Sequence, residues 1–177
     1  MDNDILLTPG PTPLPPQVRD ALGRPIIHHR TAPYRALFKR SLSGMQTVMK
    51  TSNQVLCLTS SGTGAMEAAV VNVLSPGDEA IVILGGKFAE RWQSLCKAFG
   101  ITAVTVPVAY GEAVSPKDVA AALSAHPKAK VVFSTLCETS TGVVNDIQAI
   151  AALTRKSQAV LIVDAISGLL ADDCRTD

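Results

Sequence analysis

The chain has 177 residues, a formal net charge of +1, and 47% hydrophobic but only 4% aromatic residues. This length allows one compact domain, the balanced charge argues against a nucleic-acid-binding protein, and the hydrophobic content excludes intrinsic disorder. No apolar run reaches the roughly 18–20 residues of a membrane span. The acidic N-terminus also lacks the apolar stretch of a signal peptide, so we expect a cytoplasmic protein that does not bind membranes.

The first fifty residues predict an N-terminal arm. Residues 8–16 contain five prolines and one glycine and should form an extended loop. A short helix through Leu22 should follow, and a longer one from Pro33 to about Met49. Because the arm has too little apolar material to fold alone, we divide the chain into an arm, residues 1–50, and a partial α/β domain, residues 51–177.

Beyond residue 50, apolar segments of strand length alternate with segments of helix length. This alternation predicts an α/β fold, a mainly parallel sheet with helices on both faces. Residues 101–106 mix apolar residues with threonines and should form an edge strand. The expected strands are residues 54–59, 79–84, 101–106, 130–135 and 159–164, and the expected helices are residues 63–74, 88–99, 116–125 and 146–156.

No metal site is expected. The cysteines Cys57, Cys96, Cys137 and Cys174 are far apart and form no Cys-x-x-Cys pair, which indicates buried apolar side chains or free thiols. The segment from His28 to Arg30 lacks the spacing of a metal-binding pair and fits a surface or an interface.

Ligands of open parallel sheets bind outside the carboxyl ends of the strands. The turn at residues 60–64 (Ser-Ser-Gly-Thr-Gly) opens a helix and suits either a phosphate or an ordinary N-cap. It matches no Walker or dinucleotide motif, which argues against an unrelated nucleotide- or S-adenosylmethionine-binding domain. Phe88 follows Gly85 and Gly86 at the next strand end, where its ring can cover a ligand or belong to the core.

Two further strand ends carry polar groups. Residues 135–142 form a hydroxyl-rich loop that suits either a ligand or a plain turn. Asp164 ends a wholly apolar strand, and its carboxylate needs a cation, a metal, a protonated ring nitrogen or a turn to cap.

Taken together, these motifs resemble those of the class V aminotransferases, pyridoxal phosphate (PLP) enzymes of fold type I. The resemblance is strongest to the alanine–glyoxylate and serine–pyruvate branch, and it extends over essentially the whole chain. The segments that carry it are residues 6–12, 27–30 followed by Phe38, 61–69, 86–91, 138–142 and 163–167.

The resemblance implies a role for each strand end. The carboxylate that pairs with the pyridine nitrogen would keep that nitrogen protonated, which makes the ring an electron sink. The aromatic position is Trp in many members of the family and Phe in this chain. The implied cofactor-binding residues are Ser61, Gly62 and Thr63 for the phosphate, Phe88 and Ile166 on the two ring faces, Thr139 beside the phenolic oxygen, and Asp164 at the nitrogen.

The family's reactive lysine, which forms the Schiff base with PLP, is absent, because no lysine follows Lys156. The arginine that binds the substrate carboxylate is also missing, together with the small domain that carries it. We therefore expect an N-terminal fragment that is inactive alone and has no catalytic residue of its own.

The parent protein should be a homodimeric transaminase that moves an amino group from alanine or serine to glyoxylate or pyruvate. Two alternatives within the family are an aminoethylphosphonate–pyruvate transaminase and a PLP-dependent lyase or desulfurase of the same fold. An alternative of another class is a non-catalytic α/β binding or assembly subunit.

Overall fold

A computed structural model of the protein describes residues 6–177. The chain divides into two compact units. The arm unit comprises the described residues up to Leu56 together with Asp177, and the sheet unit comprises Cys57–Thr176.

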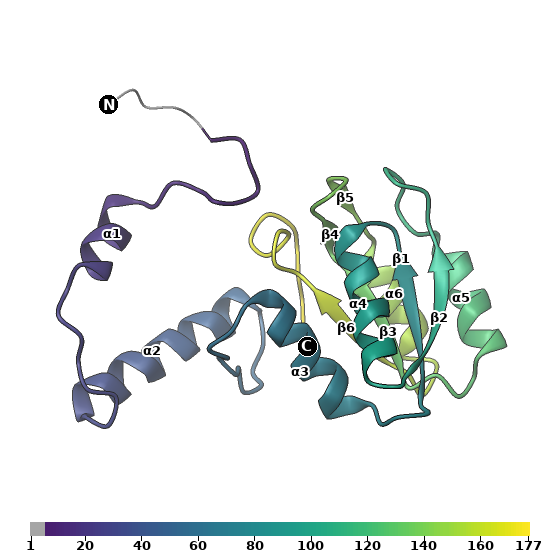
Figure 1. The fold of residues 1–177 in the computed structure, drawn as a ribbon, viewed down its shortest axis with the longest axis horizontal. Coiled ribbons are helices and arrows are strands. Elements are labelled where there is room, and N and C mark those ends of the chain that lie inside the picture. Colours follow the sequence, from purple (N-terminus) through teal and green to yellow (C-terminus); the bar gives the residue numbers. More distant parts are fainter. Residues whose placement is uncertain (1–5) are drawn as a thin grey trace. The chain divides into compact units, whose positions relative to one another are not determined.

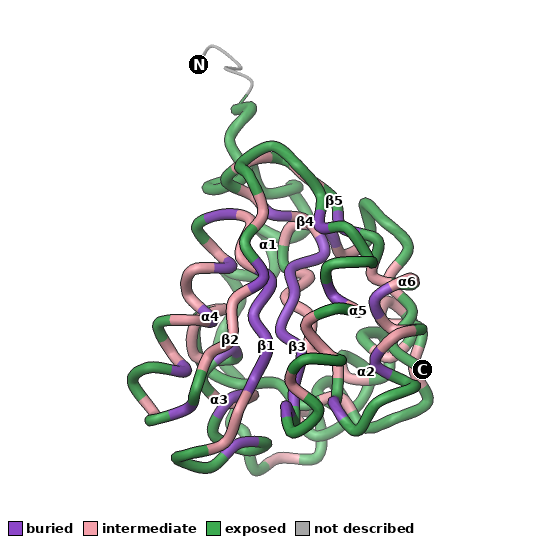
Figure 2. The backbone as a smooth tube through the Cα atoms, turned by 90° about the vertical axis from the view of Figure 1, so that its right-hand side faces the viewer, coloured by how far each residue is buried: buried purple, intermediate pink, exposed green. Residues whose placement is uncertain are grey.

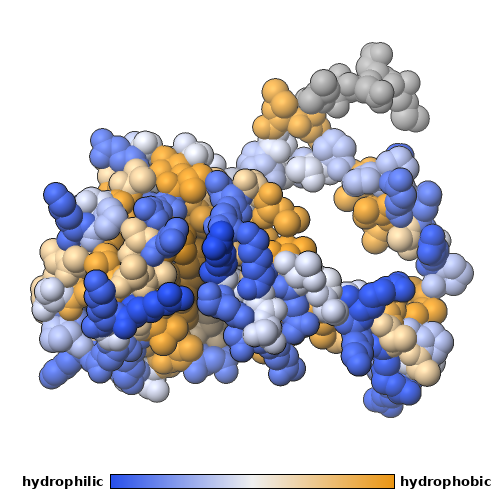
Figure 3. All heavy atoms as spheres, turned by 180° about the vertical axis from the view of Figure 1, so that it is seen from behind, coloured by the Kyte–Doolittle hydropathy of each residue, from blue (hydrophilic) through white to orange (hydrophobic). Residues whose placement is uncertain are grey.

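The arm unit contains the two helices that the sequence predicts, α1 (Pro16–Leu22) and α2 (Ala32–Val48). The amide of Tyr34 donates to the hydroxyl oxygen of Thr31, which caps α2. Neither helix buries a residue, and apolar side chains lie among charged ones on the surface of this unit (Figure 3). The arm helices therefore carry apolar side chains that are exposed on the surface of this unit.

One carboxylate organises the end of the arm unit. The Asp177 side chain accepts hydrogen bonds from Thr51 Oγ1 at 2.5 Å, from the Ser52 amide at 2.8 Å and from Asn53 Nδ2 at 2.9 Å. These donors, Thr51 first, lower the pKa of Asp177 to about 2. The carboxylate thus keeps its charge, and these hydrogen bonds, at all ordinary pH values.

The sheet unit is built on four parallel strands in the order β2-β1-β3-β6 (Figure 1). Strand β2 lies at an edge, as its threonines predict. A short antiparallel hairpin of β4 and β5, which the sequence pattern did not predict, follows β3. The elements are α3 (Gly62–Val73), β1 (Glu79–Leu84), α4 (Lys87–Ala98), β2 (Thr102–Pro107), α5 (Pro116–Ala125), β3 (Val131–Thr135), β4 (Cys137–Glu138), β5 (Val143–Val144), α6 (Ile147–Thr154) and β6 (Val160–Asp164).

Helices cover both faces of this sheet, which confirms the predicted fold class. On one face α3 and α4 pack against the sheet, and Trp92 of α4 stacks on Phe133 of β3 with ring centroids 4.4 Å apart. On the other face the core includes Val119 of α5 and Ile150 of α6. Strands β1 and β3 are therefore buried almost throughout, as the purple tube segments in Figure 2 show.

The strand predicted at residues 54–59 is wrong. These residues form no strand, and the side chains of Leu56 and Leu58 are 74% and 49% exposed. An apolar run becomes a strand only where a neighbouring strand takes up its backbone N–H and C=O groups. Within the described part of the chain, no strand pairs with this segment.

Among residues 6–177, no helix is both long and apolar enough to cross a membrane.

Candidate functional site

The predicted site residues come from four segments of the sheet unit. They lie at the start of α3 (Ser61, Gly62 and Thr63), in the first turn of α4 (Phe88), in the turn between β4 and β5 (Thr139), and at the end of β6 and just after it (Asp164 and Ile166). Thr135 and Asp164 are register partners at the ends of β3 and β6. The carboxyl ends of these strands therefore meet at one edge, as parallel pairing requires.

Helix α3 begins without a side-chain cap. Ser61 stands at its N-cap position, but the Ser61 hydroxyl makes no capping hydrogen bond. Side chains do cap the other helices of the sheet unit: Ser115 caps α5, Asp146 caps α6, and Glu138 of β4 accepts from the first amides of α4. The first amides of α3, at the positive end of the helix dipole, are therefore available to an anionic ligand.

The phosphate-type turn packs against the loop after β6. A Cβ atom on Gly62 would lie only 2.2 Å from Cδ1 of Ile166, so the two loops approach closely at this glycine. The Ile166 amide in turn donates to Asp164 Oδ1 at 3.1 Å. The structure thus brings the turn at Ser61–Thr63 and the carboxylate of Asp164 to the same edge of the sheet.

Arg91, to which the sequence analysis gave no role, joins the α3 turn to Phe88. Its Nη1 donates to Thr63 Oγ1 at 2.9 Å, and its guanidinium lies 5.1 Å from the centroid of the Phe88 ring. Because Thr63 Oγ1 accepts from Arg91, its own proton remains available to a ligand. The three-residue spacing between Phe88 and Arg91 on one helix was the signal that predicts this contact.

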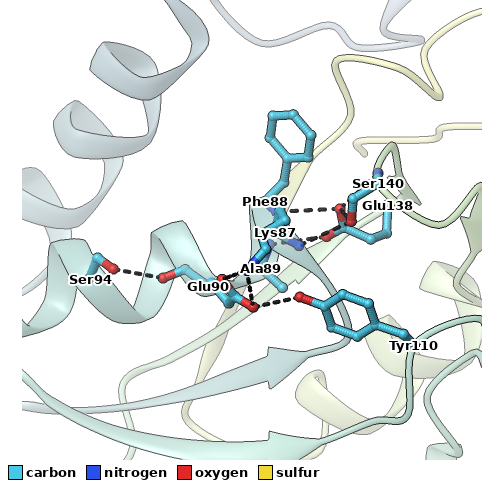
Figure 4. Close-up of polar contacts among 8 residues, drawn as sticks. All are labelled: Lys87, Phe88, Ala89, Glu90, Ser94, Tyr110, Glu138 and Ser140. Atoms are coloured by element: carbon cyan, nitrogen blue, oxygen red, sulfur yellow. Dashed lines mark hydrogen bonds and ion pairs between the residues drawn. The ribbon is translucent and has the colours of Figure 1, made fainter.

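Glu138 was also given no role from the sequence, and it links strand β4 to the start of α4 (Figure 4). Its Oε1 accepts from the Phe88 amide at 3.3 Å, and its Oε2 accepts from the Ala89 amide at 3.1 Å. The residue is only 2% exposed. The available signal was Gly86 at the N-cap of α4, since glycine has no side chain with which to cap the helix.

Thr139 connects to the loop after β6 through a hydroxyl pair. Thr139 Oγ1 lies 2.6 Å from Ser167 Oγ, and Ser167 Oγ donates to the carbonyl oxygen of Cys137 at 3.0 Å. Because the Ser167 proton is used in that second bond, Thr139 is the donor in the first. The oxygen of Thr139 is then left as an acceptor towards a ligand.

Lys87, which is adjacent to Phe88, forms an ion pair with a carboxylate of its own helix. Lys87 Nζ lies 2.8 Å from Glu90 Oε2, and Tyr110 Oη donates to Glu90 Oε1 at 2.5 Å (Figure 4). Glu90 raises the pKa of both Lys87 and Tyr110, while Lys87 and Tyr110 lower that of Glu90. The ion pair with Glu90 thus favours the charged form of Lys87.

These contacts link the four segments to one another in a closed series. The series runs from the α3 turn through Arg91 to Phe88, through Glu138 to Thr139, through Ser167 to the loop after β6, and back to Gly62 through Ile166. The arrangement suits a flat molecule with an anionic group at one end and a basic nitrogen at the other.

Comparison with known proteins identifies the family to which the chain belongs. The family model described as aminotransferase class-V matches residues 5–174. Among curated proteins, the small subunit of a soluble hydrogenase from Synechococcus is 40% identical over 171 residues, covering 95% of this chain and 44% of that protein. An L-aspartate–glyoxylate aminotransferase from Paracoccus denitrificans is 35% identical, with 97% of this chain and 45% of that protein covered.

A solved structure, an aspartate aminotransferase from Thermus thermophilus, superposes with a TM-score of 0.90 at 34% identity and covers 97% of this chain and 49% of that one. The chain thus spans about half the length of the relatives it matches. A family model that matches nearly every residue, together with relatives that align along almost the whole chain, shows that it belongs to the class V aminotransferase family.

Proposed function

We propose that the parent protein is a PLP-dependent transaminase that moves an amino group from alanine or serine to glyoxylate or pyruvate. The observation that carries this proposal is the close contact of Gly62 with Ile166, which sets the uncapped start of α3 and Asp164 at one edge of the sheet. A relative whose name pairs L-aspartate with glyoxylate supports a 2-oxo acid of this size as the acceptor.

The residues present fit the cofactor. The uncapped amides of α3 and the free proton of Thr63 suit its phosphate, and a carboxylate at Asp164 suits its pyridine nitrogen. Gly62 lets the Ile166 side chain lie against the start of α3, where the Cβ of any larger residue would meet it. In this proposal Phe88 and Ile166 lie on the two faces of the ring, and Ile166 is 70% exposed and so accessible to a ligand.

Each of these groups has a definite task in such a site. Bound PLP supplies an electrophilic carbon and an electron sink for bonds broken at the α-carbon of an amino acid. Asp164 would hold a proton on the ring nitrogen, and Thr63 and the α3 amides would hold the phosphate in place. Phe88 would exclude water from one ring face and fix the plane of the ring.

The cofactor site is testable on this chain with pyridoxamine 5'-phosphate, which needs no lysine in order to bind. Titration calorimetry should give specific binding, and Asp164→Asn and Thr63→Ala should each weaken it about tenfold, the effect of one lost charge-assisted hydrogen bond. The matched controls are Asp118→Asn and Thr102→Ala, which change the same residue types at exposed positions on α5 and β2. Equal affinity in all four variants would refute the site.

The transaminase reaction itself belongs to the full-length protein. Alanine, serine and aspartate as donors, each with glyoxylate or pyruvate, should show turnover with at least one of the proposed pairs. The isolated chain should show none, since no lysine follows Lys156. Steady formation of glycine by the isolated chain from alanine, glyoxylate and PLP would contradict this account.

We also propose that the parent is a homodimer. Helices α1 and α2 bury no residue, and two large apolar residues of the arm are strongly exposed. Leu22 is 72% exposed, and Ile26, between the two helices, is 99% exposed. Exposed apolar surface of this kind is typical of an interface between subunits. Light scattering of the full-length protein should give twice the monomer mass, and Leu22→Lys with Ile26→Lys should shift that mass towards the monomer.

A second candidate function is a non-catalytic subunit of a larger assembly. The observation that favours it is the relative from Synechococcus, which is named as a subunit of a soluble hydrogenase. Failure of the chain and of the full-length protein to bind pyridoxamine 5'-phosphate would favour this candidate over the transaminase.

A further inference from the structure

We propose that Glu138 is a positioning residue that sets the Phe88 ring against the cofactor, an inference that rests on the proposed PLP site. Glu138 is a buried side chain of β4 that contacts the start of α4, fifty residues away in the sequence. Neither the sequence motifs nor the comparisons give it a task.

The carboxylate replaces the cap that α4 lacks. Gly86 at the N-cap has no side chain, so the first amides of the helix need acceptors from elsewhere. The Glu138 carboxylate accepts hydrogen bonds from the amides of Phe88 and Ala89, and Ser140 Oγ accepts one from the amide of Lys87 at 3.1 Å. Three successive amides of α4 are thus held by one loop.

The Glu138 carboxylate also accepts hydrogen bonds from a residue close to it in the sequence. Glu138 Oε1 also accepts from Ser140 Oγ at 2.7 Å and from the Ser140 amide at 3.2 Å. No cation forms an ion pair with Glu138 among the residues that the structure describes. A buried carboxylate without a cation is costly, so its hydrogen bonds to the helix amides must offset the cost of its burial.

Glu138 contacts the backbone of Phe88 and leaves the Phe88 ring free to meet a ligand. In Figure 4 the Phe88 ring points away from the Glu138 carboxylate, which holds Phe88 only through its amide. Thr139, the next residue after Glu138, is tied to the loop after β6. One carboxylate therefore sets the spacing between two side chains that contact different parts of the proposed cofactor.

Because Glu138 caps α4, a phosphate should bind at the start of α3 rather than at the start of α4. Helices α3 and α4 begin at neighbouring loops and pack on the same face of the sheet. The carboxylate of Glu138 accepts hydrogen bonds from amides at the positive end of α4, whereas the start of α3 has no side-chain capping hydrogen bond among the described residues. An anionic ligand is therefore repelled from α4 and attracted to α3.

The experiment uses this chain, with pyridoxamine 5'-phosphate as the probe and Glu138→Gln as the variant. The amide of the glutamine retains one acceptor oxygen and turns an NH₂ donor towards an N–H group, so one of the amides of Phe88 and Ala89 loses its partner. We expect hydrogen exchange of these amides to rise about tenfold, and the affinity for the probe to fall about tenfold with a weaker circular dichroism of the bound ring.

The matched control is Asp146→Asn, which makes the same change from carboxylate to amide at the cap of α6. It should lower stability but leave both the affinity and the ring dichroism within about twofold of the unchanged chain. If Glu138→Gln does not fold, Ser140→Ala replaces it, since Ser140 is exposed and its loss removes the Lys87 contact.

A double-mutant cycle separates positioning from general stability. In a Phe88→Leu background, Glu138→Gln should cause no further loss of affinity if it acts through the Phe88 ring. Additive losses, or an unchanged affinity and dichroism in Glu138→Gln alone, would overturn the inference while leaving the cofactor site intact. A chain that does not bind the probe at all would overturn the proposed function, and this inference with it.

Discussion

Replacing Gly86 by alanine should destabilise the sheet unit through a steric conflict with Glu138. The φ angle of Gly86 is 172°, which any residue adopts, so the cost does not come from the backbone. A Cβ at this position would lie 2.4 Å from Cδ of Glu138 and 2.7 Å from Oγ of Ser140, where an ordinary contact needs at least 3.4 Å.

The carboxylate must therefore move by about 1 Å, which breaks at least one of its hydrogen bonds to α4. A hydrogen bond to a charged group contributes about 1.5–3 kcal/mol, and overpacking costs a similar amount. We expect Gly86→Ala to lower the free energy of unfolding by about 2–4 kcal/mol. Urea denaturation followed by circular dichroism measures this change as a lower midpoint.

Gly62→Ala is the matched control. Its Cβ would also meet a close atom, but that atom is the end of the exposed Ile166 side chain, which can rotate away. This substitution should change stability by less than about 1 kcal/mol. Equal midpoints for the two variants, or an undiminished cost of Gly86→Ala in a Glu138→Ala background, would refute the steric argument.

Three further predictions concern the sheet unit. Trp92→Phe should change the free energy of unfolding by only about 1 kcal/mol, because the smaller ring removes a buried Nε1 donor that has no hydrogen-bond partner within residues 6–177. Trp92→Ala should cost about 3–5 kcal/mol in the same urea assay. Burial raises the pKa of the Cys96 thiol to about 11, so at about pH 8 a thiol reagent should modify exposed Cys57 in the folded protein and Cys96 only after unfolding. The hydrogen bond from Lys130 lowers the pKa of Asp78 below its usual 3.8. The stability that this bond contributes is therefore present above pH 3.8 and is lost as the pH falls through the lowered pKa of Asp78. Lys130→Gln should flatten the decline in urea midpoint between about pH 5 and pH 2.

Local pattern was sufficient for most elements of the fold. The apolar runs that became β1 and β3 are buried on both faces, and a run of this composition has few other stable placements. The helices followed from the segments of helix length between the apolar runs, and in the structure Ser115 caps α5 and Asp146 caps α6. Each of these signals lies within the element it predicts.

The strand predicted at residues 54–59 was wrong because strand formation depends on a pairing partner from another part of the chain. Its sequence is as apolar as that of a true strand, yet Leu56 is 74% exposed, because strand formation also depends on a partner. Arg91 and Glu138 were overlooked for a related reason. Their partners, Thr63 and the amides at the start of α4, lie about thirty and fifty residues away in the sequence.

The sequence by itself determined the alternation of strands and helices, the family, and the residue types at each strand end, because all of these depend on neighbours along the chain. Only the tertiary structure decided that the α3 turn meets the loop after β6, and that Glu138 caps α4 while α3 stays uncapped. Contacts of this kind depend on how separate loops converge in space. Hydrophobic periodicity carries no information about such convergence, since buried hydrogen bonds are directional and can join any two segments that packing brings together.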